Sequence, residues 1–240
     1  MRTWALAFVL VACGGGGGGA PPDAASVGDG GLRVLGDPHQ GQYHLGPVEW
    51  TGSFPNACEP YPAQIRAIEG ELLAGLSNEV AASGDYCDAC VYVETAAGKS
   101  AVLRVVTYGV SNAPGDMDVS QAAFDLLTTG EYPRTMTWRL VQCPTAAPLY
   151  YQFQTEANPY WTSLWVRNPR DAIQSVEVTS ANHASWFALR RGTDGTLTDD
   201  GGFGTGAFTL RVTAVDGSQI EQAFPGFTAG ALVTGDTNLP

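Results

Sequence analysis

Basic residues are scarce in this chain of 240 residues. Lys99 is its one lysine, and 12 lysines and arginines stand against 24 aspartates and glutamates, so the formal net charge is −12 at pH 7. A surface of this charge repels polyanions. Nucleic acid and strongly acidic pectin are therefore poor candidates as partners, and a neutral glycan fits better.

Long apolar runs are lacking as well, except at the start. Arg2 and the apolar stretch that follows it to Ala12 have the pattern of a secretory signal. No later stretch is long enough to span a membrane. Leu10-Val11-Ala12-Cys13 resembles the bacterial lipobox, in which the cysteine thiol is lipidated before cleavage. We predict a signal peptide over residues 1–12 and a lipid anchor at Cys13, on the bacterial cell surface or outer membrane; plain secretion is the alternative.

Large apolar side chains are nearly absent from the residues that follow the anchor. Six glycines lead into a stretch rich in Ala, Pro, Asp and Gly, a composition that buries too little apolar surface to fold. We therefore expect a flexible, lipidated tether over residues 13–32. The rest of the chain, residues 33–240, suits two domains of about 100 residues each.

Metal-ligating and nucleophilic patterns are also sparse. Beyond Cys13 the chain has an even number of cysteines, so two disulfides are expected in an exported protein. The sequence leaves open which cysteines pair. These cysteines are Cys58, Cys87, Cys90 and Cys143. The CxxC spacing of the middle two occurs in redox and zinc sites, but no second CxxC or histidine pair completes a metal set. The three histidines, in loop-like stretches without a nucleophile motif, are His39, His44 and His183. We expect no metal, no cofactor and neither Ser-His-Asp nor Cys-His catalysis.

Local patterns predict a mixed first half. Turn formers bound a short strand over residues 46–52. Apolar residues at helical spacing predict a helix from Pro62 to Leu73. Two β-rich runs, 91–95 and 101–108, predict a hairpin. A second helix is predicted over Gln121–Leu127, with Ser120 or Asp118 accepting bonds from its first amides.

From Met136 onward the pattern is of strands and turns only. Strands spaced as in a β-sandwich are predicted at 136–143, 149–155, 162–168, 173–179, 185–190, 207–214 and 219–224. Asp216-Gly217 is a predicted hairpin turn. We place the domain boundary near residue 134, which gives domains 33–134 and 135–240.

Motifs in both halves resemble one family. Thr137-Trp-Arg-Leu-Val-Gln-Cys-Pro144, Asn158-Pro-Tyr-Trp161 and Val166-Arg-Asn168 resemble the carbohydrate-binding domain of bacterial expansins. Gly46-Pro-Val-Glu-Trp-Thr-Gly52 and Asp118-Val-Ser-Gln-Ala-Ala-Phe124 resemble that family's first domain. The resemblance implies a mostly β monomer, a six-stranded double-psi β-barrel followed by an immunoglobulin-like β-sandwich. It also implies binding and loosening of plant-type cell-wall polysaccharide, cellulose or hemicellulose, without hydrolysis.

Aromatic residues near strand 162–168 are the candidate polysaccharide-binding residues. The resemblance matches Tyr160 and Trp161 to two adjacent rings that bind cellulose in the family, whereas the family's third ring falls near residues 193–194. Strand alternation places Trp161 and Trp165 on one face, roughly 13–14 Å apart, with Leu164 on the other. We therefore predict that Trp165 replaces the missing ring and that at least two of the three rings are exposed.

In the first domain the resemblance places Asp118 at the acid position of related inverting endoglucanases. Those enzymes need a second carboxylate some 6.5–9.5 Å away. Expansins keep the aspartate, lack the base and do not hydrolyse. A further aspartate of many bacterial expansins corresponds to Thr107 here, and a nearby tyrosine to Gly109 or Tyr108.

Two alternatives to non-hydrolytic loosening stay open. A glycoside hydrolase or lytic transglycosylase would use Asp118 with Asp116 or Glu49 as the second carboxylate. A pure cellulose-binding adhesin would be held at the cell by Cys13. Asp118 could also serve only as a helix cap.

Overall fold

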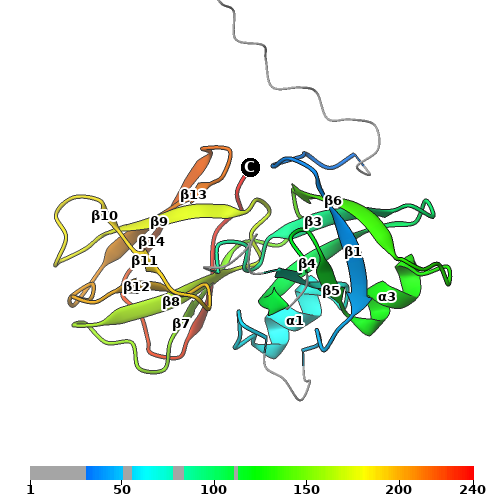
Figure 1. Cartoon of the computed structure of the whole chain (residues 1–240). Helices are drawn as coiled ribbons and strands as arrows, with labels where there is room; N and C mark the ends of the chain where they lie inside the picture. Colours follow the sequence, from blue (N-terminus) through cyan, green and yellow to red (C-terminus); the bar gives the residue numbers. More distant parts are fainter. Residues whose placement is uncertain (1–30, 51–55, 78–83, 111–112) are drawn as a thin grey trace, which may run out of the picture.

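A computed structural model describes residues 31–50, 56–77, 84–110 and 113–240. Two β domains follow each other along the chain, a barrel and then a pair of sheets (Figure 1). The predicted signal peptide, Cys13 and nearly all of the tether lie outside the described residues. Among the helices of the described ranges, none is long and apolar enough to cross a membrane.

The first domain is a closed barrel of six strands in the order β1-β5-β2-β4-β3-β6. Its strands are β1 (His39–Leu45), β2 (Leu73–Ser77), β3 (Cys90–Thr95), β4 (Ser100–Val110), β5 (Met117–Val119) and β6 (Thr135–Val141). The pairs β1–β5 and β2–β4 are parallel, and the other neighbours are antiparallel. Tyr43, Val91, Leu103 and Trp138 belong to the core that fills it. The predicted six-stranded barrel and the hairpin of β3 and β4 are confirmed.

Two short helices pack on the barrel. Helix α3 (Gln121–Leu127) has its predicted bounds, and Ser120 accepts a hydrogen bond from Ala123 N at 3.3 Å. Helix α1 (Ala63–Glu69) is shorter than predicted, because Gly70 adopts a φ of 76° and the chain then enters β2 at Leu73. Ile65 and Leu73 lie in the same buried cluster outside the barrel. The apolar residues that predicted one long helix therefore belong to two elements, α1 and the start of β2, whose side chains pack in the same cluster.

Two predictions were wrong, one about a strand and one about the domain boundary. Gly46–Trp50 forms no strand, and the strand of this region is β1, just before it; residues 51–55 lie outside the described ranges. The predicted domain boundary near residue 134 is also wrong, because β6 pairs with both β1 and β3 and closes the barrel. Met136, Trp138 and Leu140 of β6 face the barrel core, so the first domain continues to Val141.

The second domain contains two sheets, in the orders β10-β9-β13-β14 and β11-β12-β8-β7-β15. Its strands are β7 (Tyr150–Phe153), β8 (Thr162–Arg167), β9 (Ile173–Thr179), β10 (Phe187–Ala188), β11 (Arg190–Arg191), β12 (Leu197–Asp199), β13 (Phe208–Ala214), β14 (Gln219–Phe224) and β15 (Leu232–Thr234). The predicted strand 185–190 is divided between the sheets as β10 and β11. The hairpin turn at Asp216-Gly217 is confirmed, with Gly217 at a φ of 85°.

Two disulfides join Cys58 to Cys87 and Cys90 to Cys143. The number agrees with the prediction. The two cysteines of the CxxC segment bond to different partners, which excludes the redox pair that their spacing suggested. Within the described ranges, no group of three or more His, Cys, Asp or Glu side chains could hold a metal ion.

Candidate functional site

Asp118 lies in a row of residues that crosses four strands of the barrel. In register it pairs with His44 of β1 and with Gly75 of β2, and Gly75 pairs in turn with Thr107 of β4. Neighbouring strands are about 4.8 Å apart, so Thr107 and Asp118 are roughly 10 Å apart. The neighbours of Asp118 along β5, Met117 and Val119, fill the core, so alternation directs the Asp118 carboxylate to the outer surface.

A glycine leaves room for this carboxylate. Gly46 follows β1, and a Cβ atom there would lie 2.6 Å from Asp118 Oδ2. A larger residue would displace the side chain. Asp118 also lies in β5, and Ser120 fills the cap of α3, so a capping role for Asp118 is wrong.

Asp116 is occupied by contacts with β1. The residue is buried, with 7% exposed, and Oδ1 accepts a hydrogen bond from Gln42 N at 2.7 Å. Oδ2 lies 3.5 Å from His44 Nε2. Asp116 also lines a polar recess of about 580 Å³ between β1, β3 and β6, together with Gln40 and Glu94. These contacts indicate a structural role that joins β5 to β1.

Glu49 is exposed and lies beside α1. It lines a recess with Trp50, Arg66 and Glu71, and Asp118 does not line that recess. The Trp50 indole donates to Gly70 O at 2.8 Å, which holds this segment against the end of α1. Glu49 is thus placed with the helix rather than with the row around Asp118.

Tyr108 and Thr107 are both engaged in contacts away from Asp118. The Tyr108 hydroxyl donates to Thr193 O in the second domain. Thr107 Oγ1 accepts a hydrogen bond from Ala57 N at 2.9 Å. Tyr108 therefore belongs to the junction between the domains.

The three candidate rings of the second domain differ in exposure. Tyr160 is 80% exposed at the tip of a turn, where its backbone N donates to Asn158 Oδ1 at 2.9 Å. Trp161 is partly exposed, and its indole bonds to Asp200, whose pKa is lowered mainly by the bond from Arg190. Trp165 is 5% exposed. Of the three rings, Tyr160 is exposed, Trp161 is exposed in part and Trp165 is buried.

The proposal that Trp165 replaces the missing third ring is wrong. Strand alternation is as predicted, since Leu164 lies in the sandwich core and Trp165 faces the other way. However, the turn at residues 193–194 covers Trp165, whose indole donates to Asp194 O at 3.1 Å. Arg167 lies 5.2 Å from the centre of its ring. The ring is buried by a loop that is distant in sequence, and hydrophobic periodicity within the strand cannot reveal such a contact.

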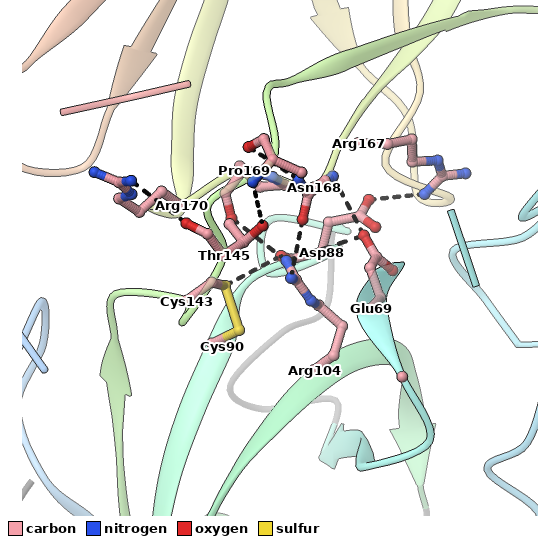
Figure 2. A network of polar contacts seen from close by, with 12 residues as sticks. Glu69, Asp88, Cys90, Arg104, Cys143, Thr145, Arg167, Asn168, Pro169 and Arg170 are labelled. Atoms are coloured by element: carbon pink, nitrogen blue, oxygen red, sulfur yellow. Dashed lines mark hydrogen bonds and ion pairs between the residues drawn. A yellow bond between two sulfur atoms is a disulfide. The ribbon is translucent and has the colours of Figure 1, made fainter. Parts of the chain in front are cut away.

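A buried Arg167 joins the two domains, a feature that the sequence analysis missed. It is fully buried in β8 and reaches the barrel, where it donates to Asp88 Oδ2 at 2.7 Å and to Cys58 O at 3.0 Å. Its guanidinium lies 4.0 Å from the centre of the Tyr61 ring. Asp88 itself lies between two disulfide-bonded cysteines, Cys87 and Cys90. Figure 2 shows Asp88 between Arg167 and Arg104.

Glu69 completes this junction. Its side chain is buried, and burial raises the pKa of Glu69 to about 8, although Arg104, at 4.0 Å, opposes the shift. Asn168 N donates to Glu69 Oε1 at 3.2 Å, which ties the end of β8 to α1 (Figure 2). The domains therefore meet through buried charged groups, which fix the orientation of the exposed rings relative to the barrel.

The described residues thus form a barrel with Asp118 on its outer surface, joined through a buried junction to a sandwich that carries the partly or fully exposed rings of Tyr160 and Trp161. No protein-family model matches the chain. Expansin-like protein 6 of Dictyostelium discoideum is 23% identical over 163 residues, which are 64% of this chain and 56% of that protein. The chain thus matches little more than half the length of this relative.

Two solved structures match the fold over most of the chain. The crystal structure of the apo expansin of Clavibacter michiganensis matches with a TM-score of 0.71, at 16% identity, over 84% of this chain and 98% of that one. A mutant of the same protein in complex with cellohexaose matches with a TM-score of 0.70. The chain is therefore expansin-like, with the expansin fold over 84% of its length.

Proposed function

We propose that this chain binds neutral plant-type cell-wall polysaccharide, cellulose or hemicellulose, and loosens it without hydrolysis. Tyr160 and Trp161 supply the stacking rings, and the charge of −12 favours a neutral glycan over a polyanion. The cellohexaose complex of the Clavibacter protein, which has the same fold, supports a β-glucan as the ligand class.

The environment of Asp118 carries the non-hydrolytic part of the proposal. Inverting hydrolysis needs a second carboxylate that activates water on the far side of the sugar. Asp116 is bonded to β1, Glu49 lines another recess, and the residue two strands away from Asp118 is the uncharged Thr107. Asp118 can then hydrogen-bond a glycan chain, and of the two candidate partners Asp116 is engaged by β1 and Glu49 lines a different recess, so neither is placed as the second carboxylate.

Paper weakening and sugar release together test this proposal. We expect wild-type protein to weaken filter paper and Asp118→Asn to weaken it less, while neither releases reducing sugar. Glu49→Gln is the matched control and should behave as wild type. Reducing sugar that appears with wild type and vanishes in both Asp118→Asn and Glu49→Gln would instead establish a hydrolase.

The adhesin alternative predicts a different pattern. A pure adhesin would bind paper without weakening it, and Asp118→Asn would have no effect on either property. Paper binding is therefore measured beside the mechanical assay.

We also propose export and anchoring through a lipid on Cys13. The two disulfides fit an oxidising compartment. Several acyl chains hold a protein firmly to a membrane, so Cys13→Ala should move the protein from the membrane fraction to the soluble one. Wild-type protein without acyl mass would contradict the anchor.

A further inference from the structure

The four-stranded sheet carries a recess on the face that points away from the sandwich core. Val178 and Leu210 fill the core, so their strand neighbours Thr179 and Thr209 lie on the opposite face. Thr209 pairs in register with Thr179 of β9 and with Ala223 of β14. These three residues line a recess of about 360 Å³, large enough for a sugar ring.

The lining combines apolar side chains with hydroxyl groups. Phe208 and Phe224 border the recess, but their rings lie in the sandwich core and are 4% exposed, so the accessible apolar part comes from Ala184, Ala207 and Ala223. Thr179, Thr209 and Ser180 contribute hydroxyls. A pyranose has an apolar face of C–H groups and a rim of hydroxyls, so this lining matches both of its surfaces.

A histidine held by a buried carboxylate forms the rim of the recess. His183 Nε2 lies 2.6 Å from Oδ2 of Asp199, whose side chain is only 2% exposed. The His183 ring stacks on Phe187 with centres 4.1 Å apart and planes 9° apart, and Phe187 is 42% exposed. The pair is thus a fixed, partly exposed aromatic wall.

A second aromatic surface follows one step along the same sheet. Arg211 lies two residues from Thr209 on β13, roughly 7 Å further. Its guanidinium lies 4.2 Å from the centre of the Trp186 ring and donates to Glu177 Oε2 at 2.6 Å. Trp186 remains partly exposed. The recess and Trp186 therefore follow each other along the strand direction.

We propose that the recess and Trp186 bind a second segment of neutral glycan, separate from Tyr160 and Trp161. The guanidinium of Arg211 on this surface is paired with Glu177, so its charge is not free to bind an anionic ligand. This proposal adds to the proposed function a second site for the same class of ligand.

The two sites lie on different sheets of one domain. Tyr160 and Trp161 precede β8 of the five-stranded sheet, whereas the recess belongs to β9, β13 and β14. Both lie toward the end of the sandwich remote from the barrel, where β10 and the start of β8 are seen in Figure 1. One molecule can then contact two glycan chains and bridge them.

Amide chemical shifts of the labelled chain, titrated with cellohexaose, test the proposal. We expect two separate groups of shifted signals, one around residues 158–162 and one around residues 179–187 and 209. Trp186→Ala should weaken binding at the second group by about 2- to 10-fold and leave the first group unchanged. Phe187→Ala and Thr209→Val test the recess independently, in case Trp186→Ala fails to fold. Tyr132→Ala removes an 87% exposed ring on the barrel and is the matched control.

Each pattern of shifts decides a different question. Shifts confined to residues 158–162 would overturn the second site and leave the proposed function standing. Shifts at the second group that persist in a Tyr160→Ala/Trp161→Ala variant would establish the second site as independent. Shifts at neither group would overturn both proposals for this glycan.

As a further readout, wild type should cross-link cellulose nanocrystals, whereas Trp186→Ala should bind them singly; equal cross-linking by both would contradict the second site.

Discussion

Exposure separates Trp161, which precedes β8, from Trp165 within that strand, although both are tryptophans. Trp161 stays partly exposed at the start of the strand, and the turn at residues 193–194 covers Trp165. Alternation predicted correctly that Leu164 faces the core and Trp165 does not. It could not predict the cover, because the turn that supplies it lies almost thirty residues further along the chain.

Replacing the exposed rings should affect glycan binding, whereas replacing the buried Trp165 should affect stability. Tyr160→Ala/Trp161→Ala should weaken cellulose pull-down, because stacked rings contribute about 0.5–1.5 kcal/mol each beyond burial, while thermal unfolding changes little. Trp165→Ala should instead cost about 3–5 kcal/mol of unfolding free energy, because it leaves a cavity at the junction. Pull-down and denaturant titration of both variants check this. Normal binding by a folded Tyr160→Ala/Trp161→Ala variant would contradict the stacking role.

Elements with a strong local pattern were predictable from the sequence. Helix α3, the hairpin of β3 and β4, and strands β9, β13 and β14 have regular spacing and clear turn residues. Strand β5 has only three residues, and β1 has a single fully buried side chain, Tyr43, so neither has a recognisable pattern. Strand β6 was recognised but placed in the wrong domain, because its partners β1 and β3 are distant in sequence.

The same limit applies to the candidate site. Asp118 and the rings at 160 and 161 were found through motifs. The cross-strand row with Gly75 and the contact between Gly46 and Asp118 depend on the register of strands far apart in the chain. Nothing local in the sequence indicates that the face of β8 that carries Arg167 meets the barrel.

Ser120 links α3 to the segment before β2. Its hydroxyl donates to Glu71 O at 2.7 Å and accepts from Leu73 N at 3.2 Å and Ala123 N at 3.3 Å. Ser120→Ala should cost about 1–2 kcal/mol of unfolding free energy, measured by urea denaturation. Ser218→Ala, which removes a hydroxyl from an exposed turn, is the control and should stay within about 0.5 kcal/mol. Equal effects of the two changes would rule out the linking role.

The whole molecule depends on the contact of Arg167 with the barrel. Arg167→Met keeps much of the side-chain volume but leaves Asp88 buried without its partner, so it should cost about 3–5 kcal/mol of unfolding free energy. Arg190→Met breaks a solvent-exposed pair with Asp200 and should leave the unfolding free energy nearly unchanged. Denaturant titration compares the two. If both variants unfold alike, the buried pair does not hold the domains together.

Glu69 makes the stability of the junction depend on pH. Burial raises the pKa of Glu69 to about 8 in the folded protein, above its ordinary value of 4.5. Between these two values the folded state keeps a proton that the unfolded state releases, so the contribution is full below about pH 4.5 and is lost as pH rises toward 8. The charged groups that face it are Asp88, Arg104 and Arg167.

Glu69→Gln should therefore change the slope of stability against pH. The glutamine amide resembles the protonated carboxyl, so the variant should unfold like wild type near pH 5 and be more stable near pH 8. Wild type should lose up to about 1 kcal/mol per pH unit relative to the variant over this interval. Urea denaturation of both proteins at pH 5, 6, 7 and 8 measures the difference, in which the histidine contributions cancel. Parallel curves would mean that Glu69 is ionised in the folded protein and paired with Arg104, and the junction would then hold two full ion pairs.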